Sequence, residues 1–179
     1  MEFNEANGGS FSVIAALSTS QLSCDRETIE RILEQGRALG LDTPAPFAIL
    51  QQTIDSRRKQ LRELLEGVRP EGKTVLGYGA STKRNVLLQY WGIDRTLLPA
   101  IAEMNEDKFR SYTPGTRIPI VLEREAMAEC LEYYLVLPWH FRTASIEREQ
   151  AYLSTGGTFI SPLPQLGLVS AEATEIYVC

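Results

Sequence analysis

Residues 74–85 constrain the fold of this chain more than any other stretch of the sequence. Residues 74–76 read Thr-Val-Leu and end in two apolar side chains. Residues 77–79 read Gly-Tyr-Gly, and residues 80–83 read Ala-Ser-Thr-Lys before a helical pattern that begins at Val86. This order predicts a strand, a tight turn and a helix N-terminus, where unpaired backbone N–H groups and the helix dipole favour a bound phosphate. The turn therefore points to a nucleotide or nucleotide-sugar ligand.

The glycine pattern alone does not settle the ligand. Position 82 is threonine, so Gly77-x-Gly79 lacks the third glycine of the dinucleotide fingerprint, and the P-loop pattern is absent. An ordinary strand-to-helix turn with a polar N-cap residue explains the same letters. Both interpretations remain open at this point.

Composition narrows the class of protein. A chain of 179 residues is one domain, or one domain with a helical extension. The net charge of −5 argues against nucleic-acid binding by bulk electrostatics, and no apolar run approaches the ~18 residues of a membrane span. Residues 1–5 do not resemble a secretory signal, so a cytoplasmic location is expected. Three scattered cysteines and one histidine predict no zinc site.

The first third of the chain reads as helical. Apolar spacing predicts one helix near Thr28 to Leu39, capped by Ser23 or Asp25, and a second from Phe47 to about Glu66. The cluster of helix-breaking residues at 67–72 then marks a change of pattern. Strands are expected at 74–77, 97–102, 133–137 and 158–161, with an extended piece at 118–121 and helices at 83–91, 123–130 and 145–154.

This alternation predicts right-handed βαβ units. The expected fold is therefore α/β, a Rossmann-like parallel sheet flanked by helices and preceded by an N-terminal helical pair. The expected ranges are an N-terminal extension at 1–22, the helical pair at 23–72, the Rossmann-like core at 73–169 and a tail at 170–179.

Three polar clusters follow predicted strands and should meet at one edge of the sheet. They are residues 79–83, residues 103–105 (Glu-Met-Asn) and residues 139–142 (Trp-His-Phe-Arg). Ligands of such sheets bind beyond the carboxyl ends of the strands, where Glu103 is suited to accept a hydrogen bond from a ribose hydroxyl. A loop carboxylate at Glu103 and a surface histidine at His140 are the alternatives.

Several longer motifs resemble one known family. The sequence is similar to the C-terminal domain of bacterial S-adenosylmethionine-dependent sugar C-methyltransferases, which methylate a ring carbon of deoxysugar nucleotides. The similarity runs from about residue 1 to 168. The motifs that carry it are Gly77-Tyr78-Gly79-Ala80-Ser81-Thr82-Lys83, Ile101-Ala102-Glu103, Tyr112-Thr113-Pro114-Gly115-Thr116, Leu137-Pro138-Trp139-His140-Phe141-Arg142 and Arg148-Glu149-Gln150.

The resemblance implies a nucleotide-sugar-binding domain that presents the hexose of a dTDP-sugar to a separate methyl-transfer domain. Family members carry a zinc-binding cysteine module, an S-adenosylmethionine domain and a catalytic segment upstream. None of these is expected within this sequence, so it is read as a fragment or a split gene product. No cofactor of its own, and no activity by the chain alone, are expected.

The resemblance and the strand-end geometry together suggest the ligand contacts. The turn that includes Gly77 would meet the diphosphate, residues after the second strand would lie near the nucleoside, and residues after the third strand would line the mouth, with His140 a candidate base. The diphosphate set is Gly79, Ser81, Thr82, Lys83 and Asn85; the nucleoside set is Glu103, Asn105 and Lys108; the mouth set is His140 and Arg142.

Three arginines depart from the family pattern. Arg84 and Arg110 stand where the family usually has glycine, and Arg117 stands where it has histidine. These side chains would either favour a more anionic ligand or serve only as surface charges.

Two other functions fit parts of the sequence. An NAD(P)-dependent sugar oxidoreductase would use Glu103 on the ribose or the arginines on a 2′-phosphate, but its Tyr-x-x-x-Lys constellation is absent. A pure interaction module would complete a separate methyltransferase subunit through the helices at 24–66. Nucleic acid and membrane are not expected as partners.

Overall fold

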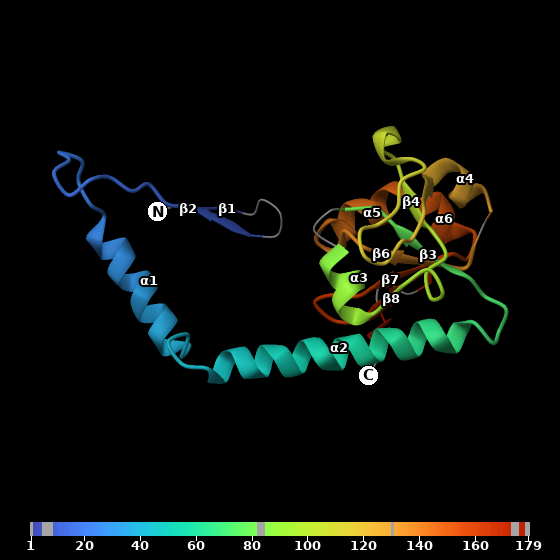
Figure 1. The fold of residues 1–179 in the computed structure, drawn as a ribbon, viewed down its shortest axis with the longest axis horizontal. Coiled ribbons are helices and arrows are strands. Elements are labelled where there is room, and N and C mark those ends of the chain that lie inside the picture. Colours follow the sequence, from blue (N-terminus) through green and yellow to red (C-terminus); the bar gives the residue numbers. More distant parts are fainter. Residues whose placement is uncertain (1, 5–8, 82–84, 130, 173–175, 178–179) are drawn as a thin grey trace. The chain divides into compact units, whose positions relative to one another are not determined.

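The chain divides into two units, residues 1–54 and residues 55–179, and the division falls inside the long helix α2 (Ala45–Val68). The computed structural model describes residues 2–4, 9–81, 85–129, 131–172 and 176–177 (Figure 1).

The first unit consists of isolated elements. Strands β1 (Glu2–Asn4) and β2 (Ser10–Ser12) form an antiparallel hairpin, followed by helix α1 (Arg26–Ala38) and the start of α2. The Asp25 carboxylate accepts a hydrogen bond from the Thr28 N–H at 3.2 Å, which confirms Asp25 as the N-cap of α1. None of the described residues of this unit is buried.

The second unit is built on a seven-stranded sheet in the order β5-β4-β3-β6-β7-β8-β9 (Figure 1). The first five strands are parallel, and β8 and β9 pair antiparallel at one edge. The predicted α/β class is confirmed, with a mixed edge. The strands are β3 (Val75–Tyr78), β4 (Ile101–Glu103), β5 (Ile120–Leu122), β6 (Tyr133–Val136), β7 (Thr158–Ser161), β8 (Gly167–Val169) and β9 (Ile176–Tyr177).

Helices connect the parallel strands. They are α3 (Asn85–Trp91), α4 (Glu123–Ala128), α5 (Arg142–Arg148) and α6 (Gln150–Ser154), with 3₁₀ turns η3 (Glu106–Lys108) and η4 (Trp139–Phe141). Two predictions were wrong in detail. The single helix expected at 145–154 is two helices that meet at Glu149, whose φ of −102° and ψ of 30° are not helical. The strand expected from residue 97 begins at Ile101, because the N–H groups of Leu97 and Leu98 bond to the Asp94 carbonyl.

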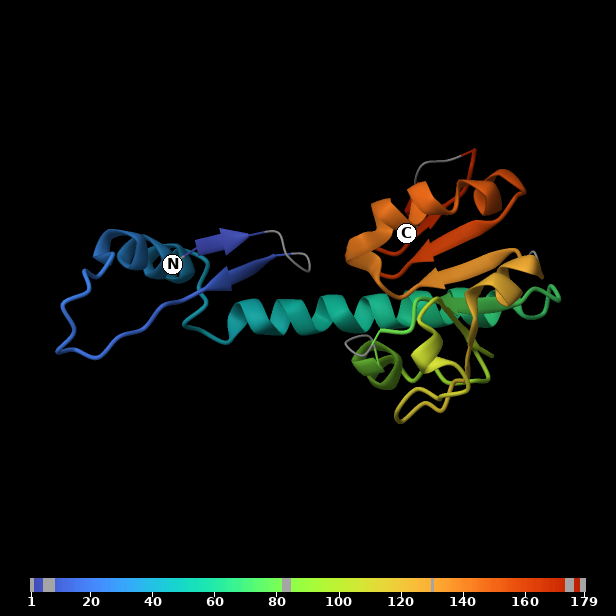
Figure 2. The same ribbon diagram turned by 90° about the horizontal axis from the view of Figure 1, so that it is seen from above.

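Helices cover both faces of the sheet, which explains why its central strands are apolar throughout. On one face, α2 and α3 contribute Leu61, Leu65 and Leu88 to a cluster with Leu135 and Ile160. The opposite cluster joins α4 and α6 to the sheet through Ala126, Tyr152, Tyr78, Tyr134 and Phe159. Figure 2 shows this layering from a second direction.

The predicted helical pair therefore contributes to the core through one helix alone. Its second member, α2, buries Leu61, Leu65 and Val68, all within the second unit, whereas α1 buries no residue. In the described part of the chain, no helix combines the length and the apolar character that a bilayer crossing requires.

Candidate nucleotide site

The chain order of the sheet reverses between β3 and β6. From β3 the sheet grows outward through β4 and β5, and then returns to the other side of β3 with β6 and β7. Open α/β sheets bind ligands in the crevice that such a reversal leaves at the carboxyl ends of the strands. The turn after β3 and the turn after β6 flank this point.

Gly79 begins the turn after β3 and is shaped by its neighbours. Its φ is 81°, its N–H donates to the Ala102 carbonyl at 2.8 Å, and a Cβ on it would lie 2.9 Å from the Pro138 ring. Only glycine suits that position without strain. A Cβ on Gly77 would lie 2.7 Å from Ile101 Cγ1, so Gly77 serves packing in the core.

The remaining residues predicted for the diphosphate are only partly described. Ser81 is half-buried in the turn, and Asn85 is half-buried at the first position of α3. Thr82 and Lys83, together with Arg84, lie outside the described residues. Their proposed contacts stay predictions.

The nucleoside set forms one hydrogen-bonded group after β4. The Lys108 ammonium donates to the Ala80 carbonyl at 2.7 Å and to Glu103 Oε2 at 3.0 Å, while Glu103 Oε1 accepts from the Asn105 N–H at 2.9 Å. The Asn105 side chain in turn caps η3 by accepting from the Asp107 N–H. Lys108 thereby connects the ends of β3 and β4, and the Glu103 side chain is only 12% exposed.

The mouth set follows β6 as an aromatic turn. The His140 ring lies 5.0 Å from the Trp139 ring and 4.6 Å from the Phe141 ring, centroid to centroid. Arg142 is the first residue of α5, and the predicted role of its side chain lies outside what the structure describes. His140 is therefore placed at the predicted edge, beside two other rings.

A second polar group at the same edge was not predicted. The Arg148 guanidinium donates to Glu123 Oε2 at 2.8 Å, to Glu149 Oε1 at 2.7 Å and to the Met104 sulfur at 2.9 Å, and it also contacts the Tyr78 hydroxyl. Tyr78 ends β3, Met104 follows β4 and Glu123 follows β5. Arg148 thus ties together the ends of three strands.

Burial shapes the titration of this Arg148 group. The Tyr78 hydroxyl donates to Glu149 at 2.9 Å, and burial followed by this bond raises the pKa of Tyr78 far above its ordinary value. Burial also raises the pKa of Glu123, and the charges of Glu149 and Glu103 add to the rise, against the lowering effect of Arg148. At the carboxyl ends of β3, β4 and β5, three carboxylates therefore lie close to the Arg148 guanidinium and the Lys108 ammonium. They belong to Glu103, Glu123 and Glu149.

The sequence contained a signal for part of this group. Arg148 and Glu149 lie within one of the motifs that carry the family resemblance, but helical periodicity gave them no role. Tyr78 also lies within one of these motifs, but a tyrosine in a strand is an ordinary feature and was given no role. Glu123 had no distinguishing pattern, because a glutamate at a helix start is common.

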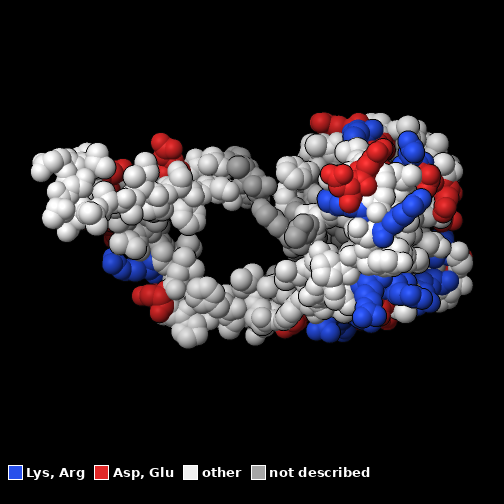
Figure 3. Space-filling view, turned by 45° about the horizontal axis from the view of Figure 1, so that its top comes forward, with Lys and Arg blue, Asp and Glu red and all other residues white. Residues whose placement is uncertain are grey.

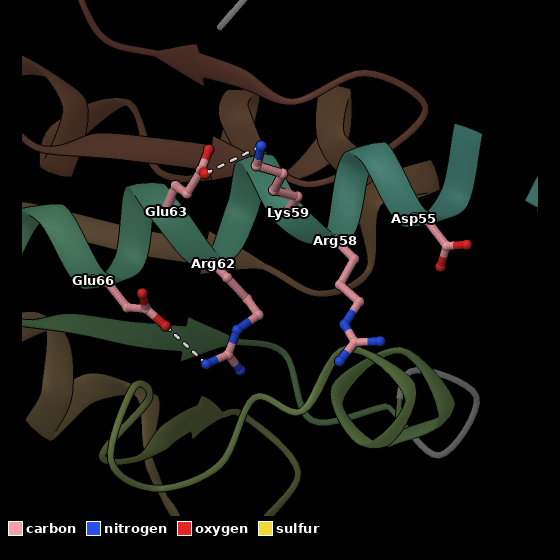
Figure 4. A pocket seen from close by; sticks show the side chains of 6 residues that line it. All are labelled: Asp55, Arg58, Lys59, Arg62, Glu63 and Glu66. Atoms are coloured by element: carbon pink, nitrogen blue, oxygen red, sulfur yellow. Dashed lines mark hydrogen bonds and ion pairs between the residues drawn. The ribbon is translucent and has the colours of Figure 1, made fainter. Parts of the chain in front are cut away.

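A groove elsewhere on the second unit is lined by charged side chains of α2. It has a volume of about 420 Å³, and its lining residues are Asp55, Arg58, Lys59, Arg62, Glu63 and Glu66 (Figure 4). Arg62 donates to the Gly92 carbonyl at 2.6 Å and pairs with Glu66 at 2.7 Å, so it caps the C-terminal end of α3. The groove is thus explained by helix capping and surface ion pairs.

Acidic and basic side chains intermix on the face of the second unit that Figure 3 shows. Among the described residues, no group of three or more histidine, cysteine, aspartate or glutamate side chains is arranged to hold a metal ion.

Comparison with known proteins identifies the family. Residues 5–164 match the family model described as the C-methyltransferase C-terminal domain. The chain belongs to this family. It is 33% identical over 170 residues to C-methyltransferase NovU of Streptomyces niveus, an alignment that covers 95% of this chain and 40% of NovU. The chain therefore spans about two fifths of the length of this relative.

Two of the arginines that depart from the family pattern occupy unusual backbone positions. Arg110 has a φ of 61° and Arg117 a φ of 53°, both in the left-handed region. Position 110 is one where the family resemblance leads us to expect glycine, the residue that adopts this conformation without steric cost. An arginine at position 110 thus places a residue with a Cβ in a left-handed backbone conformation, independently of the contacts that its side chain makes.

Proposed function

We propose that this chain is the nucleotide-sugar-binding domain of an S-adenosylmethionine-dependent C-methyltransferase, acting on a dTDP-deoxysugar type of ligand. The observation that carries the proposal is the chain reversal between β3 and β6, with Gly79 at one flank and the Glu103–Lys108 pair beside it. Membership of the C-methyltransferase C-terminal domain family supports the reaction class.

Each polar group has a distinct part in the proposal. The turn from Gly79 to Asn85 receives the diphosphate, because backbone N–H groups and Lys83 supply donors and positive charge. Glu103 accepts a hydrogen bond from a sugar hydroxyl of the nucleoside, and Lys108 and the Asn105 N–H hold its carboxylate in place. His140 contacts the substrate at the mouth.

Methyl transfer itself is assigned to another domain. Transfer to carbon needs a bound S-adenosylmethionine, a base that removes a carbon-bound proton and stabilisation of the resulting enolate. In this proposal the methyl donor binds outside residues 1–179. Purified chain is accordingly expected to transfer no methyl group from S-adenosylmethionine to a deoxysugar nucleotide.

Calorimetric titration with dTDP at fixed low salt tests the binding site. Lys83→Ala should weaken dTDP binding by roughly 10- to 150-fold, because a charged hydrogen bond typically contributes ~1.5–3 kcal/mol. Lys59→Ala is the matched control, since Lys59 is an exposed lysine of α2. Equal dTDP affinities for wild type and Lys83→Ala would remove Lys83 from the site, and no binding to wild type would contradict the ligand.

Thermal shifts separate the alternative functions. A ligand at ~100 times its Kd stabilises the folded state by roughly 2.7 kcal/mol. We expect dTDP to raise the melting temperature, and S-adenosylmethionine, NAD⁺ and NADP⁺ to leave it unchanged. A shift with NADP⁺ alone would favour the oxidoreductase.

A further inference from the structure

The turn after β6 is built directly against the turn after β3. The Leu137 N–H donates to the Tyr78 carbonyl at 3.0 Å, which carries the β3–β6 pairing to the last residue before Gly79. The Pro138 ring then occupies the space beside Gly79, and the Pro138 carbonyl accepts from the Phe141 N–H at 2.7 Å. The aromatic turn, residues 138–141, therefore lies directly beside the turn after β3, where the chain order of the sheet reverses.

The rings of this turn are only partly covered. Phe141 is 51% exposed, and Trp139 and His140 are half-buried. The His140 ring contacts Trp139 edge-to-face and Phe141 at a tilt, and these arrangements leave part of the aromatic surface available to another group. Aromatic surface of this kind, at the mouth of a polar site, suits a ligand part with an apolar face.

The order of the strands fixes which part of the ligand reaches these rings. In such a site the acidic residue after the neighbouring strand binds the ribose, and the glycine turn binds the diphosphate. Glu103 follows β4, Gly79 follows β3, and the aromatic turn follows β6 on the opposite side of β3. In a nucleotide sugar the hexose follows the diphosphate, so the hexose is expected at the carboxyl end of β6.

We propose that Trp139, His140 and Phe141 form a platform on which the hexose ring of the nucleotide sugar packs through its C–H face. This inference rests on the proposed function. A deoxysugar replaces hydroxyl groups by hydrogen, which enlarges its apolar face and improves the match to aromatic rings. Phe141, the most exposed of the three, determines affinity for the hexose rather than for the nucleotide.

The test compares two probes, dTDP and dTDP-glucose, by calorimetric titration of the full chain. Wild type should bind dTDP-glucose more tightly than dTDP. Phe141→Ala should weaken dTDP-glucose binding by roughly 4- to 15-fold, as expected for the loss of one or two buried C–H contacts, and should leave dTDP binding unchanged. Phe141→Tyr keeps a ring and should retain the wild-type affinities.

A matched control is Tyr112→Ala, which removes another exposed aromatic ring, in the loop between β4 and β5, and should change neither affinity. Equal weakening of both probes by Phe141→Ala would overturn the proposal in favour of a nucleobase on the ring. Unchanged affinities for both probes, or equal wild-type affinity for the two, would also overturn it. If wild type binds neither probe, the proposed function itself fails.

Discussion

The two units of this chain contain similar apolar side chains but use them in opposite ways. In the first unit Phe11, Ile14 and Leu17 are 66%, 89% and 82% exposed. In the second, Leu65 and Leu135 are fully buried between helices and sheet. The two units therefore differ in how far their apolar side chains are buried, and not in the types of apolar side chain that they contain. The second unit has its own core, whereas the first is held by local hydrogen bonds.

The local bonds of the first unit are identifiable. The Asp25 side chain caps α1, and the Thr43 hydroxyl donates to the Gly40 carbonyl at 2.8 Å. Such bonds define helix ends and turns but contribute only about 1 kcal/mol each. The free energy of unfolding should therefore arise in the second unit.

The largest expected effect tests this directly. Leu65→Ala should lower the free energy of unfolding by about 2–5 kcal/mol, because it leaves a cavity in a fully buried site. Leu33→Ala, at a leucine of α1 that is 53% exposed, should change it by less than about 0.5 kcal/mol. Urea denaturation followed by circular dichroism measures both. A comparable loss for the two variants would show that the first unit has a core in solution.

A smaller effect is expected at Arg148. Arg148→Met should destabilise the second unit by about 1–3 kcal/mol, since Glu123 and Glu149 lose a charged hydrogen-bonding partner while 15% and 17% exposed. Arg58→Met, on the exposed side of α2, is the control and should have little effect.

The pH dependence identifies the cause of that loss. Burial raises the pKa of Glu123 above its ordinary value, so protonated Glu123 stabilises the folded state. This contribution to the free energy of unfolding is present at low pH and is lost as the pH rises through the folded-state pKa. Without Arg148 this pKa rises further. The deficit of Arg148→Met in denaturation experiments should thus shrink as pH falls from 7 toward 5, and a constant deficit would point to packing alone.

The smallest effect is a gain. Arg110→Gly should stabilise the second unit by about 0.5–1 kcal/mol, because the left-handed backbone of Arg110 is unfavourable for a residue with a Cβ. The same change at Arg95, whose φ is not in that region, should be neutral or destabilising. Thermal unfolding of both variants compares them; destabilisation by Arg110→Gly would mean that the side chain makes a compensating contact.

The sequence predicted the α/β class and a parallel sheet, because β3, β6 and β7 are apolar runs bounded by turn residues, but it did not predict the order of the strands in that sheet. The sequence did not predict the elements whose strand pairing depends on the rest of the fold. β8 and β9 have only three and two residues, too few for a periodic pattern. The turn at Leu97 and Leu98 looked like a strand because apolar letters do not reveal a hydrogen bond to Asp94.

The site was predictable to the extent that it depends on strand ends. Glu103, Asn105 and Lys108 were expected together and are joined by hydrogen bonds. Arg148 reaches the same edge from a helix 45 positions beyond Glu103, and no local spacing reveals such a contact. Gly77 has a packing role that the sequence did not predict, because a Cβ there would lie 2.7 Å from Ile101 Cγ1, and its contact with a ligand stays a prediction.

The contact between Gly79 and Pro138 has a practical consequence for protein engineering. Any side chain at position 79 would push the Pro138 ring, and with it the backbone from which the aromatic turn extends. The two turns therefore cannot be redesigned independently. If the proposed hexose platform is correct, a library aimed at new sugar acceptors would vary positions 139–141 and leave Gly79 and Pro138 unchanged, because both turns depend on them.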